Sequence, residues 1–570
     1  MGWQKYAARL RALTDRDAGA RPLDGVGTPN SPPGKDNNVQ VNNVVTVDDQ
    51  PVVESTEAGE LSLEEDAHGG MGRHLGIVST TFLIVGRIIG TGIFSTPSSI
   101  TQSVGSVGAA LMLWVLGLVL AYCGLLVWLE FGCMYPRSGG EKVYLEAVYK
   151  RPRFLATVIF AVQAIALGFT GTLFTHLVFL FLVSRSSSGC IVFASNIVVA
   201  AGRNPGEWEE RAIAIGVIVF VTLVHTFIPH TGVKLMNVIS SIKVIILLFI
   251  VVTGWVVLGG GIKSIPDPHA SFRNAFAGSS HSGYFYATAL FKVLNSYAGW
   301  SNAAYVLNEV RRPVHTLKIA GPLGLGICGV LYLLANVAYF AAATPREIAS
   351  SGTTVAGFFF GRVFGHTAQR VLSVFVALSA LGNVFTITFA QARVNQELAK
   401  EGVIPFQRFW ASTWPVGSPS TGLLLHFIPS FIVIVAIPFG DAFNFILDVE
   451  GYPGSVISAF VVVGLFLLRW RQPHAPRPFR VWLPVAVFFL AGQLFLLVAP
   501  FLRPPGGKGD TSLPYWLASV IGIVVLFLGV VYWFVWRKAL PRLFGYELVQ
   551  QKVVLADGTV VTTFERVKKD

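Results

Sequence analysis

The sequence predicts an all-α membrane protein with twelve transmembrane helices, ten of which form a five-plus-five inverted repeat with helices 1 and 6 broken. Hydrophobic residues make up 53% of the 570 residues and charged residues only 13%, whereas soluble domains carry about 25% charged residues. Windows such as 107–131 exceed the roughly 18 apolar residues that indicate a membrane-spanning helix. Two apolar segments are interrupted at matching places in the two halves, which is typical of an inverted repeat.

The composition divides the chain into three parts. Residues 1–74 are rich in Gly, Pro, Asn, Asp and Glu, with an acidic stretch over 48–66, and this predicts a disordered tail. The tail lacks the basic start, apolar run and cleavage site of a secretory signal, so we expect it to stay in the cytosol. A membrane domain is expected over residues 75–537, and a second cytosolic tail over residues 538–570.

Twelve apolar segments form the expected membrane domain when residues 154–203 are counted once. They are 76–100, 107–131, 154–203, 212–228, 235–259, 284–307, 319–343, 367–392, 420–438, 443–468, 482–502 and 514–536. With a cytosolic N-terminus, about seventeen Lys and Arg residues fall in inside loops and about eight in outside loops, which is the bias that cytoplasmic loops show. We therefore expect an integral membrane protein, placed in the plasma membrane, with both termini cytosolic.

The third segment is too long for one ordinary span. Two spans over 154–203 would move the basic clusters of the later loops to the outside, so the charge bias favours a single crossing. Residues 171–188 are then an extra piece, which we interpret as an insertion in helix 3, such as intron sequence left in the coding sequence. Without these residues, one helix of about 32 residues remains, which a tilted helix accommodates.

The first segment contains the first expected break. Three glycines and a proline lie within Gly86–Pro97, and each interior glycine costs a helix about 1 kcal/mol relative to alanine. We expect an unwound turn at Gly90, Thr91 and Gly92, which is tolerated at membrane depth only where the backbone is buried in protein or lines a cavity. The freed N–H groups suit a carboxylate and the freed carbonyls an ammonium, and an α-amino acid carries both.

The sixth segment repeats this pattern. Polar and small residues interrupt its apolar run over Asn295–Asn302. A second interpretation remains open for both clusters, because glycines also let helices pack closely. Two clusters at matching positions favour the broken-helix interpretation.

At these residues the chain resembles the amino acid–polyamine–organocation superfamily and, within it, the L-type amino acid transporter family. Residues Gly90–Phe94 resemble the family's GSGIF turn, residues 136–141 its PxSGG loop, and Glu309–Pro313 its EEVKNP motif. Arg393 together with residues 400–405 resembles R…REGxLP. The motifs occur in the family's order between residues about 75 and 410.

The resemblance is most detailed to the fungal high-affinity methionine permeases. It is carried by residues 138–146 and by the stretch from Tyr297–Trp300 through residues 316–324. The resemblance implies a secondary active transporter that imports neutral L-amino acids, methionine in particular, by proton-coupled alternating access. A large neutral amino acid exchanger, an amino-acid-sensing receptor and a channel remain alternatives.

The family pattern also implies the residues that bind the substrate. It implies that Thr91 and Gly92, in the turn that begins at Gly90, offer hydroxyl and N–H groups to the carboxylate. Carbonyls for the amine would come from Ile88 and from Asn295 or Ala298. Asn295 departs from the pattern, because L-type transporters usually have an aromatic gate there.

Two aromatic residues flank the second expected break. Tyr297 and Trp300 are candidates for stacking on the substrate side chain. Aromatic residues at helical spacing are more often packing residues, so this second interpretation stays open.

Lys243 begins the apolar run of the fifth segment and is a candidate for proton coupling. A lysine inside the membrane costs roughly 2.5–3.5 kcal/mol on insertion scales, which makes a functional role the first hypothesis. It matches the fifth-helix lysine that, in proton-coupled and exchanging members of the family, occupies the place of a sodium ion. The alternative is an interfacial lysine whose ammonium reaches the cytosolic surface.

Arg87 lies one turn before the glycine turn and needs an anionic partner. Glu130, at the inner end of the second segment, and Glu309, at the inner end of the sixth, are the nearest candidates in the predicted topology. We therefore predict an inner gate in which Arg87 pairs with one of them. A static anchor at the helix end is the alternative.

Other classes of site are not indicated. The four cysteines, Cys123, Cys133, Cys190 and Cys328, lie in apolar windows without metal-ligand spacing, and the histidines form no HExxH pattern. We therefore expect no catalytic residues, no metal site, no cofactor other than the coupling proton, no nucleic-acid partner, and no enzyme activity.

The expected partners are the amino acid substrate and membrane lipid. The loop over residues 201–208 has no cysteine, so a disulfide-linked heavy chain of the kind that joins animal L-type transporters is not expected. The tails carry candidate ubiquitin acceptors for a ubiquitin-ligase machinery, namely Lys5, Lys35, Lys568 and Lys569.

Overall fold

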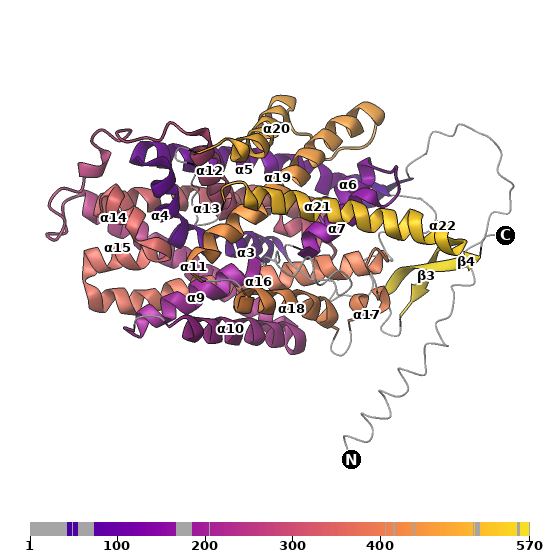
Figure 1. Ribbon diagram of the computed structural model, residues 1–570, viewed down its shortest axis with the longest axis horizontal. Coiled ribbons are helices and arrows are strands. Elements are labelled where there is room, and N and C mark those ends of the chain that lie inside the picture. Colours follow the sequence, from indigo (N-terminus) through magenta and orange to yellow (C-terminus); the bar gives the residue numbers. More distant parts are fainter. Residues whose placement is uncertain are drawn as a thin grey trace, which may run out of the picture.

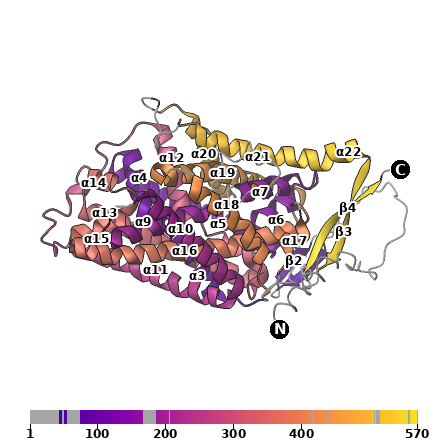
Figure 2. The ribbon, with the colours of Figure 1, turned by 60° about the horizontal axis from the view of Figure 1, so that its bottom comes forward.

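The chain folds into a bundle of long helices, and a computed structural model describes most of it. The described residues are 43–47, 50–54, 73–166, 185–203, 206–404, 406–413, 417–436, 439–504, 507, 514–555 and 559–568. Within these ranges, nine helical stretches are long and apolar enough to cross a membrane. Figures 1 and 2 show these helices running lengthwise through the molecule.

The first half of the bundle begins with a helix in two pieces. Its elements are α3 (Ile77–Ile88), α4 (Gly92–Val104), α5 (Val107–Met134), α6 (Glu141–Val148), α7 (Leu155–Ala166), α9 (Arg185–Ala200), α10 (Glu207–Phe227) and α11 (Pro229–Leu258). Glycine and proline residues place these boundaries. Gly105, with φ +76°, ends α4 in the left-handed conformation, and Pro229 stands at the first position of α11.

The second half contains another divided helix. Its elements are η2 (Ala270–Phe272), α12 (Gly283–Tyr297), η3 (Asn302–Glu309), α13 (Pro313–Ala342), α14 (Pro345–Ser350), η4 (Gly352–Thr354), α15 (Val355–Phe364), α16 (His366–Lys400), α17 (Gln407–Ala411), α18 (Ser420–Ala436), α19 (Phe439–Arg471), α20 (Leu483–Val498), η5 (Ala499–Phe501), α21 (Leu517–Phe534), the π-helical turn η7 (Val535–Ala539) and α22 (Leu540–Phe544).

The predicted all-α membrane architecture is confirmed in its coarse form. Three of the twelve predicted spans are not among the nine long apolar helices. The third contains α7 and α9 on either side of residues 167–184, which lie outside the described residues, the sixth ends as an α-helix at Tyr297, and α18 has 17 residues. Residues 171–184 of the expected insertion lie outside the described residues, so the insertion stays a prediction, as does the count of twelve.

Both expected tails contain a β-hairpin. In the N-terminal part, β1 (Asn43–Val47) pairs antiparallel with β2 (Gln50–Glu54), which differs from the disorder expected over residues 1–74. Val52 of β2 is fully buried in a cluster with Cys133 and Val314. This packing gives a short valine-rich segment the apolar contact that an isolated hairpin lacks.

The second hairpin joins β3 (Tyr546–Val554) to β4 (Val560–Lys568). Figures 1 and 2 show it at the same end of the molecule as α6 and α17, whereas α14 and α15 lie at the opposite end. A Cβ atom built on Gly402, which has φ +72°, would lie 2.5 Å from the Thr562 carbonyl oxygen. Glycine is therefore required where the loop after α16 meets β4.

A buried carboxylate connects α5 to the end of α19 and to the loop between α19 and α20. Glu130 is fully buried, forms ion pairs with Arg469 and Arg477, and accepts a 2.8 Å hydrogen bond from the Val481 N–H. Burial lowers the pKa of the Arg477 guanidinium, and the nearby Glu130 charge acts in the opposite direction. One carboxylate thus compensates two arginines that are mostly shielded from water.

We predict that Glu130→Gln strongly destabilises the protein, because it leaves two buried guanidinium groups without their counter-charge, at a cost of about 3–5 kcal/mol. The apparent melting temperature of the purified protein in detergent measures this effect. Glu209→Gln is the matched control, since its pair with Arg203 is exposed (43% and 71%) and worth at most about 1 kcal/mol. Equal melting temperatures for the two variants would contradict the prediction.

Candidate functional site

The first helix is interrupted where the glycine turn predicts it. Helix α3 ends at Ile88, Ile89 has φ −71° and ψ 85°, and helical structure resumes at Gly92 in α4. The carbonyls of the last turn of α3 have no partner within the helix, apart from Val85, whose oxygen accepts from the Ile89 N–H. In a membrane these carbonyls need donors from the protein.

Two side chains supply those donors. The Nζ atom of Lys243, on α11, donates to the Gly86 carbonyl at 2.6 Å, and the hydroxyl of Tyr332, on α13, donates to the Ile88 carbonyl at 2.5 Å. Both side chains are fully buried. Lys243 therefore lies inside the bundle against the interrupted helix, and its ammonium does not reach the surface. The Ile88 carbonyl, expected to bind the substrate amine, already accepts a hydrogen bond.

The glycines of the turn also allow close packing. A Cβ atom on Gly90 would lie 2.6 Å from the Asn383 side chain, and one on Gly92 would lie 2.7 Å from Cβ of Ser296. Ser296 and Thr96 are joined by a 2.9 Å hydrogen bond between their hydroxyls. The two interpretations of the glycine cluster are thus both correct, because the helix breaks here and α4 packs closely on α12.

The second interruption follows Tyr297. Ala298 adopts an extended conformation, with φ −62° and ψ 135°, and Gly299 has φ +130°. A Cβ atom on Gly299 would lie 2.4 Å from Cγ of Arg87. Glycine is needed here for two reasons, the backbone conformation and the close approach of the arginine. Arg87 is thereby placed directly beside the break in α12.

A cavity of about 180 Å³ lies along this second break. Three predicted substrate residues, Asn295, Ala298 and Trp300, line it, whereas the other predicted residues, Ile88, Gly90, Thr91, Gly92 and Tyr297, are not in its lining. Its remaining lining residues come from α3, α5, α6, α7, α12, η3, α19, α20 and the segment between α12 and η3, namely Arg87, Ala121, Glu141, Phe160, Gln163, Phe291, Leu294, Gly299, Ser301, Asn302, Tyr305, Gly451, Gly454, Ser455, Ile457, Ser458, Phe489 and Gln493.

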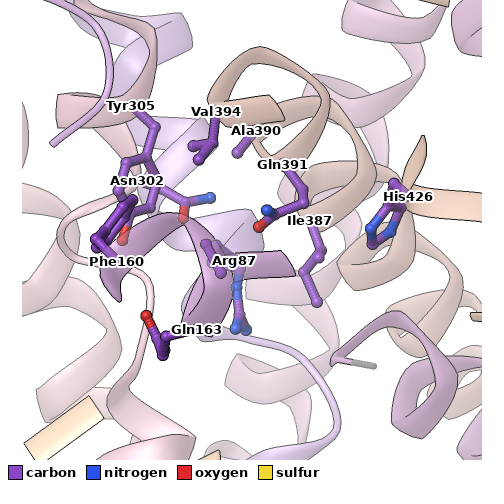
Figure 3. A pocket seen from close by; sticks show the side chains of 11 residues that line it. Arg87, Phe160, Gln163, Asn302, Tyr305, Ile387, Ala390, Gln391, Val394 and His426 are labelled. Carbon is purple, nitrogen blue, oxygen red and sulfur yellow. The ribbon is translucent and has the colours of Figure 1, made fainter. Parts of the chain in front are cut away.

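A smaller cavity of about 60 Å³ shares part of this wall. Figure 3 shows Arg87 between Asn302 and Tyr305 of η3 on one side and Ile387 and Gln391 of α16 on the other. The residues that line both cavities are Arg87, Phe160, Gln163, Asn302 and Tyr305. Arg87 thus contributes a positive charge at the junction of the two cavities.

The two aromatic candidates have different surroundings. Tyr297 is fully buried between Trp114 and Tyr332, with ring centroids 5.6 and 5.2 Å away, so it packs in the core. Trp300 lines the larger cavity and makes an edge-to-face contact with Trp128 at 5.2 Å. Only the second arrangement leaves an aromatic surface beside the cavity.

The predicted partners of Arg87 are held by other cations. Glu309 pairs with Arg393 of α16 at 2.8 Å and lies 3.8 Å from His74, while Glu130 binds the two arginines described above. The Nη1 atom of Arg87 donates to the Asn383 side chain at 3.5 Å. The three residues of the predicted inner gate therefore lie in three separate polar clusters in this structure.

The motifs that are far apart in the sequence meet at the end of the bundle near α6. The Ser138 hydroxyl accepts from the Asn308 N–H at 3.0 Å, and the Ser138 N–H donates to the Asn308 side chain at 3.3 Å. Lys142 forms an ion pair with Glu401 of the loop after α16. Glu141 accepts 3.0 Å hydrogen bonds from Trp128 and from Tyr305 of η3.

Several residues of this region were not predicted from the sequence. Tyr332, Gln163 and Gln493 are polar side chains inside apolar segments, and only their position in the folded bundle distinguishes them from packing residues. Lys292 of α12 is fully buried, and a lysine within an apolar run is a signal that was available. Within the described residues, no group of three His, Cys, Asp or Glu side chains is placed to hold a metal ion.

Comparison with known proteins gives a consistent result. Residues 75–527 match the family described as "Amino acid permease". The chain is 38% identical over 519 residues to a high-affinity methionine permease of Saccharomyces cerevisiae, covering 90% of this chain and 87% of the relative. It is 32% identical over 510 residues to the low-affinity methionine permease of the same yeast, covering 87% and 88%.

A mammalian relative is more distant. The b(0,+)-type amino acid transporter 1 of Mus musculus is 28% identical over 502 residues, covering 87% of this chain and 94% of the relative. The expected resemblance is therefore confirmed, and the long apolar helices agree with an integral membrane protein. The family match and the identity to the yeast permeases show that this chain belongs to the amino acid permease family.

Proposed function

We propose that the protein imports neutral L-amino acids, with methionine as its preferred substrate, by proton-coupled alternating access. Its family consists of membrane permeases, which transport amino acids and are not enzymes. The observation that carries the proposal is the cavity of about 180 Å³ beside the interrupted α12. This volume is below the roughly 300–1,000 Å³ of pockets for drug-sized ligands, which fits a smaller solute such as an amino acid.

The backbone at the α12 break supports recognition of an amino acid. Asn295, Ala298, Gly299, Trp300 and Ser301 line the cavity. The Asn295, Gly299 and Ser301 carbonyls accept hydrogen bonds from N–H groups three residues further along the chain, which leaves the Ala298 and Trp300 carbonyls as the candidate acceptors among these residues. Carbonyl groups at such a break attract an ammonium group. Arg87 supplies a positive charge on the same wall for the carboxylate.

Lys243 is the proposed proton-coupling residue. Its ammonium is a donor to the Gly86 carbonyl in the last turn of α3, and loss of its proton would replace a charge-assisted hydrogen bond by a weaker one. The protonation state of Lys243 would thereby be linked to the position of α3. In this proposal no sodium ion is needed, and the proton is the coupling ion.

The finer architecture belongs to the same proposal. Breaks after Ile88 and after Tyr297 support a five-plus-five inverted repeat with two additional helices, giving twelve spans. The distribution of Lys and Arg supports cytosolic termini, and uptake from outside the cell requires the plasma membrane. The cysteine-free loop over residues 201–208 supports a transporter that works without a disulfide-linked heavy chain.

We predict that the purified protein in liposomes accumulates labelled methionine in sodium-free buffer when an inward proton gradient is imposed. Uptake without the gradient should stop at equilibration with the medium, because no energy source then drives accumulation. Protein-free liposomes are the control. Uptake that requires preloaded internal amino acid would identify an exchanger instead, and binding without uptake would identify a receptor.

We predict that Lys243→Met abolishes gradient-driven accumulation of methionine in the same assay, because it removes the titratable group and the donor to Gly86. Lys243→Arg should bind methionine but lose the response to the gradient, since arginine keeps its proton at all working pH values. Lys263→Met, at an exposed lysine, is the matched control. Full proton-driven accumulation by Lys243→Met would refute the coupling role.

A further inference from the structure

We propose that Gly454 of α19 and Gln493 of α20 form the subpocket that receives the substrate side chain, and that this subpocket selects an unbranched thioether side chain. The inference rests on the proposed amino acid transport and adds to it the residues that determine specificity. Both residues line the larger cavity together with the residues of the α12 break.

Gly454 differs from the other glycines of the cavity lining. A Cβ atom on Gly299 would meet Arg87 at 2.4 Å, and one on Gly451 would meet the Phe291 ring at 2.5 Å, so packing explains both. A Cβ atom on Gly454 would meet no described atom within 4 Å. An interior helical glycine costs about 1 kcal/mol relative to alanine. Close packing therefore does not explain the glycine at position 454, whereas a need for open space in the cavity does.

A neighbouring proline offers another explanation for this glycine. Pro453 lies inside α19, and a glycine beside a proline eases a kink in a helix. The two explanations predict different results for side chains of increasing size. If glycine is needed for a kink, any larger side chain at position 454 should weaken binding of all substrates. If glycine leaves room for a subpocket, a larger side chain should weaken binding of long substrates in proportion to the volume that it fills.

Buried amides give the cavity its polarity. Gln493 is 4% exposed and Gln163 7% exposed, and both line the cavity. The Asn302 Nδ2 atom is buried without a partner among the described residues. Buried polar groups are normally hydrogen-bonded. The contents of the cavity, solute or water, are therefore the source of an acceptor for the Asn302 amide, and the Gln163 and Gln493 amides line the same space.

The remaining wall near Gly454 is aromatic. Phe291, Trp300 and Phe489 line the cavity, and Trp300 and Phe489 both pack against Trp128, with centroid distances of 5.2 and 6.2 Å. A thioether sulfur makes favourable contacts with aromatic rings and is also a weak hydrogen-bond acceptor. A site that combines aromatic rings with a buried amide donor fits this group better than it fits a purely aliphatic chain.

The size of the subpocket is tested by equilibrium binding of labelled methionine to purified wild type, Gly454→Ala and Gly454→Leu. The expected dissociation constant rises severalfold for the alanine variant and by about tenfold or more for the leucine variant, which is the effect of excess methylene groups in a fitted pocket. Gly216→Leu is the control, since Gly216 lies in α10 on an exposed surface with no atom within 4 Å of its Cβ position.

Wild-type affinity in Gly454→Leu would overturn the proposal. Thermal melting and gel filtration show whether that variant is folded, and Gly454→Ala decides the question if it is not. Unchanged binding by Gly454→Ala would then overturn the proposal as well. Competition by alanine adds a second criterion. If Gly454→Leu shortens the pocket, the affinity for methionine should fall more than the affinity for alanine. If Gly454→Leu distorts α19, the two affinities should fall equally.

The role of the amide is tested with norleucine, in which a methylene group replaces the sulfur of methionine. Wild type should bind methionine severalfold more tightly than norleucine, and Gln493→Leu should reduce this preference to about one. An unchanged preference in Gln493→Leu would overturn the role of Gln493. If wild type binds no neutral amino acid at all, the proposed function fails, whereas normal wild-type binding with unaffected variants refutes only the subpocket.

Discussion

The structure depends on how the interrupted first helix satisfies its freed carbonyls in an environment without water. Lys243 donates to the Gly86 carbonyl and Tyr332 to the Ile88 carbonyl, so α11 and α13 are both held against the end of α3. An unsatisfied backbone group in hydrocarbon costs several kcal/mol, which makes these two hydrogen bonds a condition for the break. The break in turn places Arg87 beside Gly299 and at the junction of the two cavities.

The breaks could be predicted from sequence because they depend on local chemistry. Three glycines near Gly90 weaken a helix wherever it lies, and a charge such as Lys243 in an apolar run is rare enough to be noticed. The groups that complete the site could not be predicted in this way. Tyr332 and Gln493 are ordinary residues of apolar segments, and they lie at the break and at the cavity only because particular helices are neighbours. Helix neighbours are determined by packing between distant segments, which periodicity does not reveal.

The same distinction applies to charge pairs and to the tails. The acids of the inner loops were recognised, but their partners were assigned by proximity in a predicted topology, which does not determine side-chain direction. Glu309 forms an ion pair with Arg393, and Glu130 forms ion pairs with Arg469 and Arg477. The hairpin of β1 and β2 was missed because its composition is that of a disordered tail. Burial of Val52 against α5 and α13, and of Val53 in the main core, gives this segment a reason to fold.

The contrast between the two breaks constrains how the proposed transport would proceed. The α12 break borders a cavity, whereas the turn between α3 and α4 is closed by Asn383 and Ser296, each within 2.7 Å of a glycine Cβ position. If a substrate carboxylate is to reach the N–H groups of Thr91 and Gly92, α4 must separate from α12 at the Thr96–Ser296 hydrogen bond. That bond is between neutral hydroxyls and contributes only about 1 kcal/mol. The contact that closes the turn is therefore weak enough to exchange for a bound solute, whereas the hydrogen bonds of Lys243 and Tyr332 behind it hold α3 in place.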